Sequence, residues 1–154
     1  MNDHKQASFK TLIELTQNNV DEASIQLGKL IAERRNAAQQ LDVLKEYRQD
    51  YANRLNNAGQ SGMTASNYHN FTRFLATLDE AILQQTRVMT HMDYNISVSK
   101  ENWRSKQQRL HSYETLQTRR NQQRTTFENR REQLISDELS AAIHRRSSSD
   151  RGLQ

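Results

Sequence analysis

Apolar residues recur along the first half of the chain in steps that alternate between four and three residues. Eleven of the fourteen positions in this series are apolar; Thr16, Arg34 and Arg48 are the polar ones. The whole series is Phe9, Ile13, Thr16, Val20, Ala23, Leu27, Leu30, Arg34, Ala37, Leu41, Leu44, Arg48, Tyr51 and Leu55. A 3.5-residue repeat places one narrow apolar stripe on a helix and predicts a coiled-coil partner.

A second stripe follows a break rich in asparagine, serine and glycine. The break spans residues 56–66 and contains Gly59 and Gly62, two of the four glycines in the chain. These residue types end one helix and cap the next. The second stripe occupies these positions: Tyr68, Phe71, Leu75, Leu78, Ile82, Gln85, Met89, Met92, Ile96, Ser99, Trp103, Lys106, Leu110 and Tyr113. Beyond Tyr113 the same steps meet mostly glutamine and arginine, so the stripe fades.

The two stripes face each other position by position when the chain folds back at Ser61–Gly62. The residue numbers of opposed stripe positions then add up to 122 or 123. This register sets Phe9 opposite Tyr113 and Leu27 opposite Ile96, whereas a slip of one heptad would set Phe9 against Arg120. The prediction is an all-α fold, an antiparallel two-helix coiled-coil hairpin with an extended C-terminal helix. Helix one covers about 8–57, the turn 58–65 and helix two about 66–142, in one domain over 1–146 with a disordered tail at 147–154. Residues 114–142 have no partner helix.

Composition supports long straight helices. The chain has no proline and no cysteine, its hydrophobic fraction is 34%, and its mean hydropathy is −1.02. A compact α/β or β domain needs more turns and more apolar mass. The absence of cysteine excludes disulfides and thiolate metal sites. No apolar run is long enough for a transmembrane helix or a secretory signal, so we expect a cytoplasmic protein.

Charge is concentrated toward the C-terminus. Residues 1–99 carry 10 Lys/Arg against 11 Asp/Glu, and residues 100–154 carry 12 against 7. The basic part of helix two therefore lies far from the turn and should attract an acidic surface. Two alternatives stay open: a basic coiled coil that binds nucleic acid, and a passive, chaperone-like spacer rod. Lysine and arginine on a helix surface also commonly serve only to keep that surface solvated, with no binding partner.

The sequence contains no arrangement typical of an active site. It has no glycine-rich phosphate loop and no nucleophile elbow, and its five histidines (His4, His69, His91, His111 and His144) form no metal-binding motif. The adjacent carboxylates at 79–80 and at 137–138 point about 100° apart on a helix. We therefore expect no enzymatic activity, no cofactor and no metal.

Several spaced residues carry a family resemblance. Before the turn they are Leu41, Leu44, Tyr47, Tyr51, Leu55 and Asn56; after it they are Asn70, Phe71, Phe74, Leu78, Ala81 and Ile82, then Trp103, Arg104, Lys106, Arg109, Leu110, Tyr113, Leu116 and Arg119. Their order and spacing over residues 9–120 resemble the FliJ family of flagellar type III export proteins. The off-seam aromatics and the Trp-Arg-x-Lys run make the match more specific than heptad leucines alone.

The resemblance implies a role in flagellar protein export. FliJ proteins resemble the central stalk, or gamma, subunit of rotary ATPases, insert their terminal end into the hexameric ring of the export ATPase FliI, and promote its assembly. Another part contacts the cytoplasmic domain of the export gate protein FlhA, and the family also binds flagellar export chaperones. It implies a soluble protein at the cytoplasmic face of the inner membrane, associated with the membrane through its partners only, that does not bind nucleic acid.

The resemblance also implies two binding regions. Residues that match the gate-binding patch are Gln40, Leu44, Tyr47, Tyr51, Phe74, Leu78, Ala81 and Gln85. The last departs from the family pattern, in which histidine can occur. Four of the eight lie on the stripes, where packing is the alternative role. Tyr47 and Phe74 lie off the stripes and are expected to be neighbours on one side. The ATPase-facing end is assigned to Phe9, Ile13, Trp103, Arg104, Arg109, Tyr113, Arg119, Arg120 and Arg124.

Overall fold

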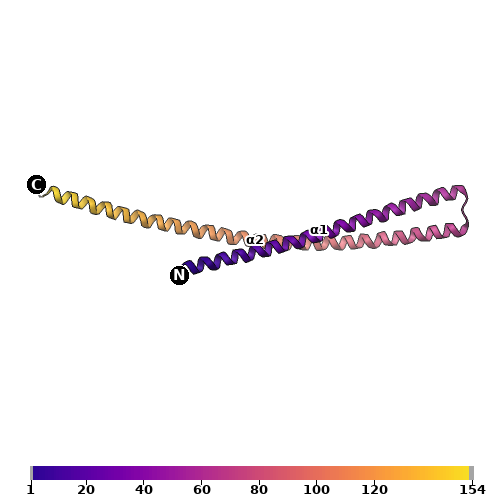
Figure 1. The fold of residues 1–154 in the computed structure, drawn as a ribbon, viewed down its shortest axis with the longest axis horizontal. Coiled ribbons are helices and arrows are strands. Elements are labelled where there is room, and N and C mark those ends of the chain that lie inside the picture. Colours follow the sequence, from indigo (N-terminus) through magenta and orange to yellow (C-terminus); the bar gives the residue numbers. More distant parts are fainter. Residues whose placement is uncertain (1, 153–154) are drawn as a thin grey trace. The chain divides into compact units, whose positions relative to one another are not determined.

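The computed structural model describes residues 2–152, and they form two long helices. Helix α1 spans Asn2–Ser61 and helix α2 spans Ala65–Arg151. The predicted all-α fold is confirmed. Figure 1 shows α1, coloured indigo to purple, joined by the turn to α2, coloured pink to yellow. None of the helices in this part of the chain is long and apolar enough to cross a membrane.

Both helices are longer than the spacing of apolar residues indicated. Helix α1 begins at Asn2 rather than near 8, and α2 ends at Arg151 rather than near 142. Residues 147–151, placed by the sequence in a disordered tail, are helical. The serine hydroxyls bond back to the preceding turn, from Ser147 Oγ to the His144 carbonyl at 3.0 Å and from Ser148 Oγ to the Arg145 carbonyl at 3.0 Å. Residues 153 and 154 lie outside the described residues.

The turn is shorter than predicted because only one residue needs an unusual backbone conformation. Gly62 has a φ of +84°, a left-handed conformation that glycine adopts without steric cost. Gly59 stays within the last turn of α1. Thr64 then caps α2, because its Oγ1 accepts a hydrogen bond from the Asn67 backbone N–H at 3.3 Å.

Contacts within the chain group it into two units. We call Thr16–Gln107 the turn unit, and Met1–Leu15 with Gln108–Gln154 the terminal unit. In the turn unit the two helices run antiparallel and pack along the predicted stripes. Its buried residues all lie on those stripes: Thr16, Val20, Ala23, Ala37, Leu41, Leu78 and Ile96.

Contacts between the two helices agree with the predicted register. In the turn unit the Gln85 side chain donates to the Ala37 carbonyl at 3.0 Å, and the rings of Tyr51 and Phe71 have centroids 5.9 Å apart. In the terminal unit the rings of Phe9 and Tyr113 meet edge to face at 6.4 Å. Each of these pairs is one that the register sets opposite.

A disulfide can test the register at a pair that these contacts do not reach. Cysteines at Leu27 and Ile96 should crosslink under mild oxidation, because the chain has no cysteine of its own and the two positions share one layer of the seam. The measurement is the mobility shift on a non-reducing gel and its loss on reduction. Leu27→Cys with Trp103→Cys is the matched control, since only a slip of one heptad would join these two. Crosslinking of the control pair in place of the first would refute the register.

Candidate functional site: partner-binding surfaces

The heptad positions sort the candidate gate-binding residues onto one edge of the turn unit. We write the stripe residues as heptad positions a and d. Four members of the patch occupy d positions: Leu44, Tyr51, Leu78 and Gln85. The other four, Gln40, Tyr47, Phe74 and Ala81, occupy g positions, each directly before an a position. In an antiparallel pair the g positions of both helices flank the same side of the seam. We call this side the g edge and the opposite side the e edge.

Aromatic side chains form the turn-proximal part of the g edge. The rings of Tyr51 and Phe74 have centroids 4.5 Å apart with an interplanar angle of 46°, and the Arg54 guanidinium lies 5.4 Å from the centre of the Tyr51 ring. Phe74 is 42% exposed and Tyr47 is 54% exposed. Phe74 was expected to neighbour Tyr47; its ring contact is with Tyr51. The spacing of residues in the sequence could not show this ring contact. It assigns a residue to one edge of the helix pair but does not determine the rotamer of its side chain.

Polar side chains organise the adjoining part of the g edge. Gln85 Nε2 donates to the Ala37 carbonyl and also lies 3.4 Å from Gln40 Oε1. Gln85 therefore holds the two helices together, and Gln40 is oriented by it. A shallow groove of about 580 Å³ opens beside them, lined by Asn36, Gln39, Gln40, Val43, Leu44 and Gln85.

Val43 is a groove residue that the sequence reasoning missed. Its side chain is 47% exposed although it is apolar, and it lies off the seam. A search for apolar residues outside the stripes would have returned it together with others, such as Ile31 and Val88. The groove itself depends on the contact of the Gln85 side chain with α1.

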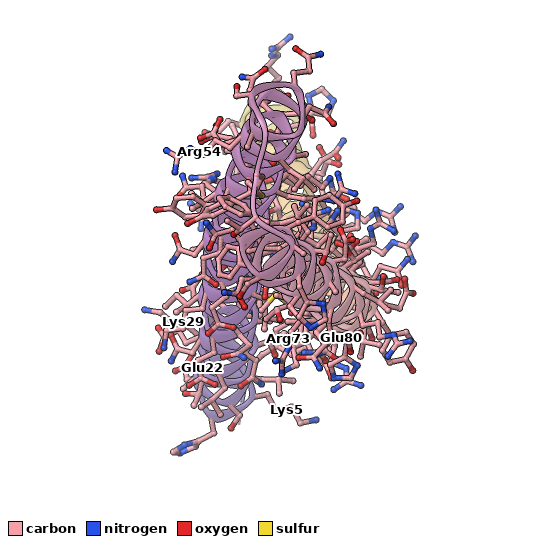
Figure 2. The ribbon with its side chains drawn as sticks, turned by 90° about the vertical axis from the view of Figure 1, so that its right-hand side faces the viewer. Lys5, Glu22, Lys29, Arg54, Arg73 and Glu80 are labelled. Carbon is pink, nitrogen blue, oxygen red and sulfur yellow. The ribbon has the colours of Figure 1, made fainter. Side chains whose placement is uncertain are left out.

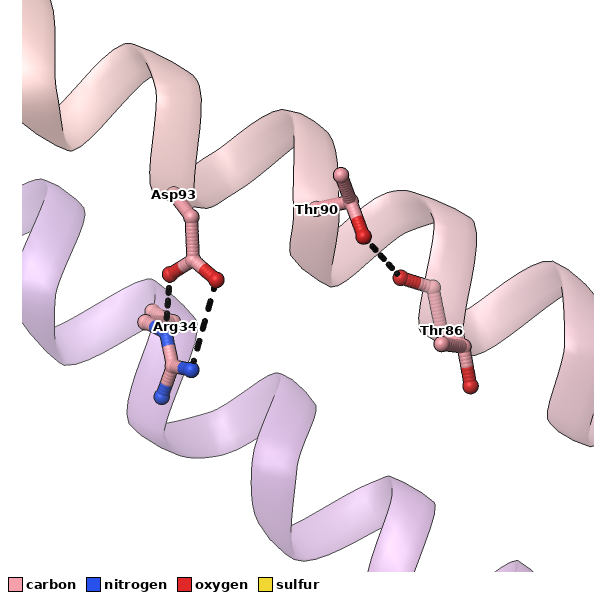
Figure 3. A network of polar contacts seen from close by, with 4 residues as sticks. All are labelled: Arg34, Thr86, Thr90 and Asp93. Carbon is pink, nitrogen blue, oxygen red and sulfur yellow. Dashed lines mark hydrogen bonds and ion pairs between the residues drawn. The ribbon is translucent and has the colours of Figure 1, made fainter.

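Two ion pairs mark the e edge. The guanidinium of Arg34 bonds to the Asp93 carboxylate, and that of Arg48 bonds to Asp79, so both arginines turn away from the apolar residues that the register sets opposite them (Figure 3 shows the first pair). The pairs repeat at the same offset two heptads apart. The Asp93 carboxylate raises the pKa of Arg34, first through the hydrogen bond and then through its charge.

These ion pairs select the register more than they stabilise it. Their side chains are 40–53% exposed, and ion pairs in contact with water add little to stability. Other charged residues face solvent, as Figure 2 shows for Glu22 and Lys29 on α1.

The terminal unit contains the last paired layers of the two helices. Leu110 is buried, and Phe9, Ile13 and Tyr113 are half-buried. The Arg120 guanidinium lies 5.5 Å from the centre of the Phe9 ring and so covers its outer side. A groove of about 330 Å³ is lined here by Gln6, Phe9, Lys10, Gln117, Arg120, Asn121 and Arg124.

Helix α2 has no partner beyond this point in the terminal unit. Every described residue from 118 to 152 is exposed, including Phe127, Leu134 and Ile135 at 68%, 64% and 57%. The apolar stripe fades after Tyr113 as expected, but contact with α1 continues farther: Thr115 and Gln117 are half-buried, and Arg120 lies against Phe9. We call residues 118–151 the extension. Between 118 and 131 it carries five arginines against one glutamate.

The candidate ATPase-facing residues divide between the two units. Trp103, half-buried, and Arg104, exposed, belong to the turn unit, and the rest belong to the terminal unit. Four of the candidates in the terminal unit are exposed arginines: Arg109, Arg119, Arg120 and Arg124. Arg124 Nε bonds to Glu128 Oε1 on the same helix at 3.2 Å. Within the described residues no three histidine, aspartate or glutamate side chains gather as they would around a metal ion.

Known proteins are similar to this sequence over most of its length. The family model described as "Flagellar FliJ protein" matches residues 4–149. The flagellar FliJ protein of Escherichia coli (strain K12) is 31% identical over 132 residues, which cover 86% of this chain and 90% of that protein. The flagellar FliJ protein of Salmonella typhi shows the same identity and coverage. A family match over nearly the whole chain, with relatives above 30% identity, shows that the chain belongs to the flagellar FliJ family.

Proposed function

We propose that this chain is a stalk-like component of the flagellar protein export apparatus. Its terminal unit binds the hexameric export ATPase FliI and promotes assembly and activity of the ring. Membership of the flagellar FliJ family supports a place in flagellar export. The observation that carries the stalk role is the extension, an exposed helical stretch of α2 with five exposed arginines over residues 118–131. A single basic helix fits the centre of a ring, and its charges favour acidic surfaces there.

The second part of the proposal assigns the g edge to the export gate. The cytoplasmic domain of FlhA binds the eight-residue patch, with Tyr47 and Phe74 as its anchors. Exposed aromatic side chains on an otherwise polar surface are typical of binding hot spots. Leu78 is buried, and Tyr51 and Gln85 contact neighbouring side chains, so these three position the patch. Flagellar export chaperones are further partners, and the protein works at the cytoplasmic face of the inner membrane through these contacts.

Hydrolysis of ATP by the purified export ATPase tests the first part. Adding this chain should raise the rate per ATPase subunit. Reversing two exposed arginines, Arg119→Glu with Arg124→Glu, should weaken the stimulation at least tenfold, because each reversal turns an attraction to an acidic surface into a repulsion. The measurement is the concentration of chain that gives half of the maximal stimulation.

The control for this test reverses the same charge on the turn unit. Arg73→Glu with Arg87→Glu, both exposed on α2, should leave the stimulation unchanged. No effect of the unmodified chain on ATP hydrolysis would contradict the stalk role. If the chain still bound chaperones, it would be a passive rod. If it bound DNA with a steep linear loss of log affinity against log salt, it would be a nucleic-acid-binding coiled coil.

A further inference from the structure

The groove near the start of α1 is built by both helices of the terminal unit and is lined by cations. Among its lining residues are three cations and three amides: Lys10, Arg120, Arg124, Gln6, Gln117 and Asn121. It has no acidic lining residue. The groove on the g edge has no charged lining residue at all, and another groove of the turn unit combines Glu33 with Arg87. The groove near the start of α1 therefore has a positive character that these two lack.

The positive groove arises because the seam changes its residue types at this point. The register that pairs Phe9 with Tyr113 sets Gln6 opposite Gln117 in the next layer, and both glutamines are half-buried. The next d and a positions of α2 hold arginines, where a coiled coil would bury apolar side chains. The two helices therefore leave a polar groove between them instead of an apolar core.

Most of the positive charge in this groove is not neutralised within the chain. Arg124 bonds to Glu128, so one of the three cations has an acidic partner. The other two form no ion pair with any described residue. Asp3 and Glu14, the acidic residues of α1 closest in sequence to Lys10, do not line the groove and bond to none of its cations.

A second groove of about 330 Å³ adjoins the first and extends its positive charge. Phe9 and Arg120 line both grooves, and Lys5 adds a further cation to the second. The second groove also lacks an acidic lining residue. An anionic ligand in the first groove is therefore not repelled from this side.

We propose that the groove binds an acidic segment of the export ATPase, whose carboxylates pair with Lys10 on α1 and with Arg120 and Arg124 on α2. The inference rests on the proposed function for the identity of the partner, and it deepens that function by adding the start of α1 to the binding surface. Charge complementarity selects the occupant, because carboxylates form strong charge-assisted hydrogen bonds with arginine and lysine. The three amide side chains supply donors and acceptors for the backbone of the bound segment.

The aromatic ring in the groove favours a peptide over a nucleic acid. The Phe9 ring meets Tyr113 edge to face at 6.4 Å, and the Arg120 guanidinium lies 5.5 Å from its centre. Proteins that bind single-stranded nucleic acids stack bases on open aromatic faces. Phe9 is already engaged by these two neighbours, and it is the only aromatic residue that lines the groove.

Charge reversal at Lys10 tests the groove in the full chain. Lys10→Glu should weaken binding to the purified export ATPase by about tenfold or more, because it places a negative charge beside the carboxylates of the bound segment. Lys10→Gln removes the charge without reversing it and should weaken binding by about threefold. Lys10 is exposed, so both variants should keep the helicity of the unmodified chain. The measurements are the dissociation constant by calorimetry and the helicity by circular dichroism.

Lys29→Glu is the matched control. It makes the same change at an exposed position of α1 in the turn unit and should leave ATPase binding unchanged. Equal binding by Lys10→Glu and the unmodified chain would overturn the groove. If the reversal of Arg119 and Arg124 still weakened ATPase stimulation, the extension alone would bind the ring and the proposed function would stand.

A labelled hexaglutamate peptide tests the groove without the ATPase. By fluorescence anisotropy the chain should bind this peptide more tightly than single-stranded DNA of similar charge, and Lys10→Glu should weaken peptide binding more than Lys29→Glu does. Equal effects of the two variants, or tighter binding of the DNA, would overturn an acidic peptide as the occupant. If the unmodified chain did not bind the ATPase, the proposed function would be contradicted, and the peptide would still decide the chemistry of the groove.

Discussion

Replacing Ala32 by proline should lower the free energy of unfolding of the hairpin by about 3 kcal/mol or more. Ala32 is exposed at an f position of α1, so the substitution leaves the seam intact and acts through the backbone alone. Proline removes the hydrogen bond to the carbonyl of Gly28 and forces its ring against that carbonyl. The resulting kink separates seam layers on both sides of position 32.

Thermal unfolding followed by circular dichroism checks this prediction. A loss of 3 kcal/mol corresponds to a fall in Tm of about 12–24 °C for a unit of this size. Ala32→Gln is the control, because glutamine is a good helix former at an exposed position and should change stability by less than about 0.5 kcal/mol. If the proline variant had the same Tm as the unmodified protein, the stability of the helices would not depend on a continuous seam.

The largest functional effect is expected from removing both exposed aromatics of the g edge. Tyr47→Ala with Phe74→Ala should weaken binding to the cytoplasmic domain of the gate protein by about 100-fold or more, while stimulation of the export ATPase is kept. Truncating a hot-spot aromatic typically costs 2 kcal/mol or more. The two effects can be separated because the proposed ATPase-binding residues of the extension lie in the other unit of the chain.

Binding is measured by calorimetry and compared with a matched pair of exposed tyrosines. Tyr68→Ala with Tyr94→Ala removes two aromatics that are 52% and 66% exposed on α2 and outside the patch, so gate binding should be unchanged. Phe74 packs on Tyr51, and losing this contact should cost about 0.5–1.5 kcal/mol of stability. Retention of gate binding by the double variant would refute the assignment of the patch to the gate. A large loss of helicity by circular dichroism would show that Tyr47 and Phe74 stabilise the fold instead.

The seam itself was readable from spacing, because burial in a two-helix pair follows position in the heptad almost alone. The buried residues of the described chain all lie on the two stripes, and exposure rises where the stripe fades. Helix ends were less readable. Without a proline the chain contains no strong stop signal, and the serine hydroxyls of 147 and 148 satisfy backbone carbonyls inside the helix instead of capping it.

The partner-binding surfaces were readable only in outline. The sequence spacing placed Tyr47 and Phe74 on one edge. The structure adds that the Phe74 ring packs against Tyr51, while Tyr47 is more exposed than Phe74. Spacing also set Arg34 and Arg48 on the seam, opposite apolar residues. Their long side chains instead reach carboxylates on the e edge, a choice that depends on which residues of the other helix come within range.

By itself the sequence determined the helical fold, the seam and the register, because a 3.5-residue repeat dictates which face of a helix is buried. The tertiary structure decided which side chains bridge the helices and which stay free: Gln85 across to Ala37, Phe74 on Tyr51, Arg34 to Asp93. These contacts join residues 23 to 59 positions apart in the chain and depend on rotamers. A periodic pattern carries no information about rotamers, so only packing between the helices could select them.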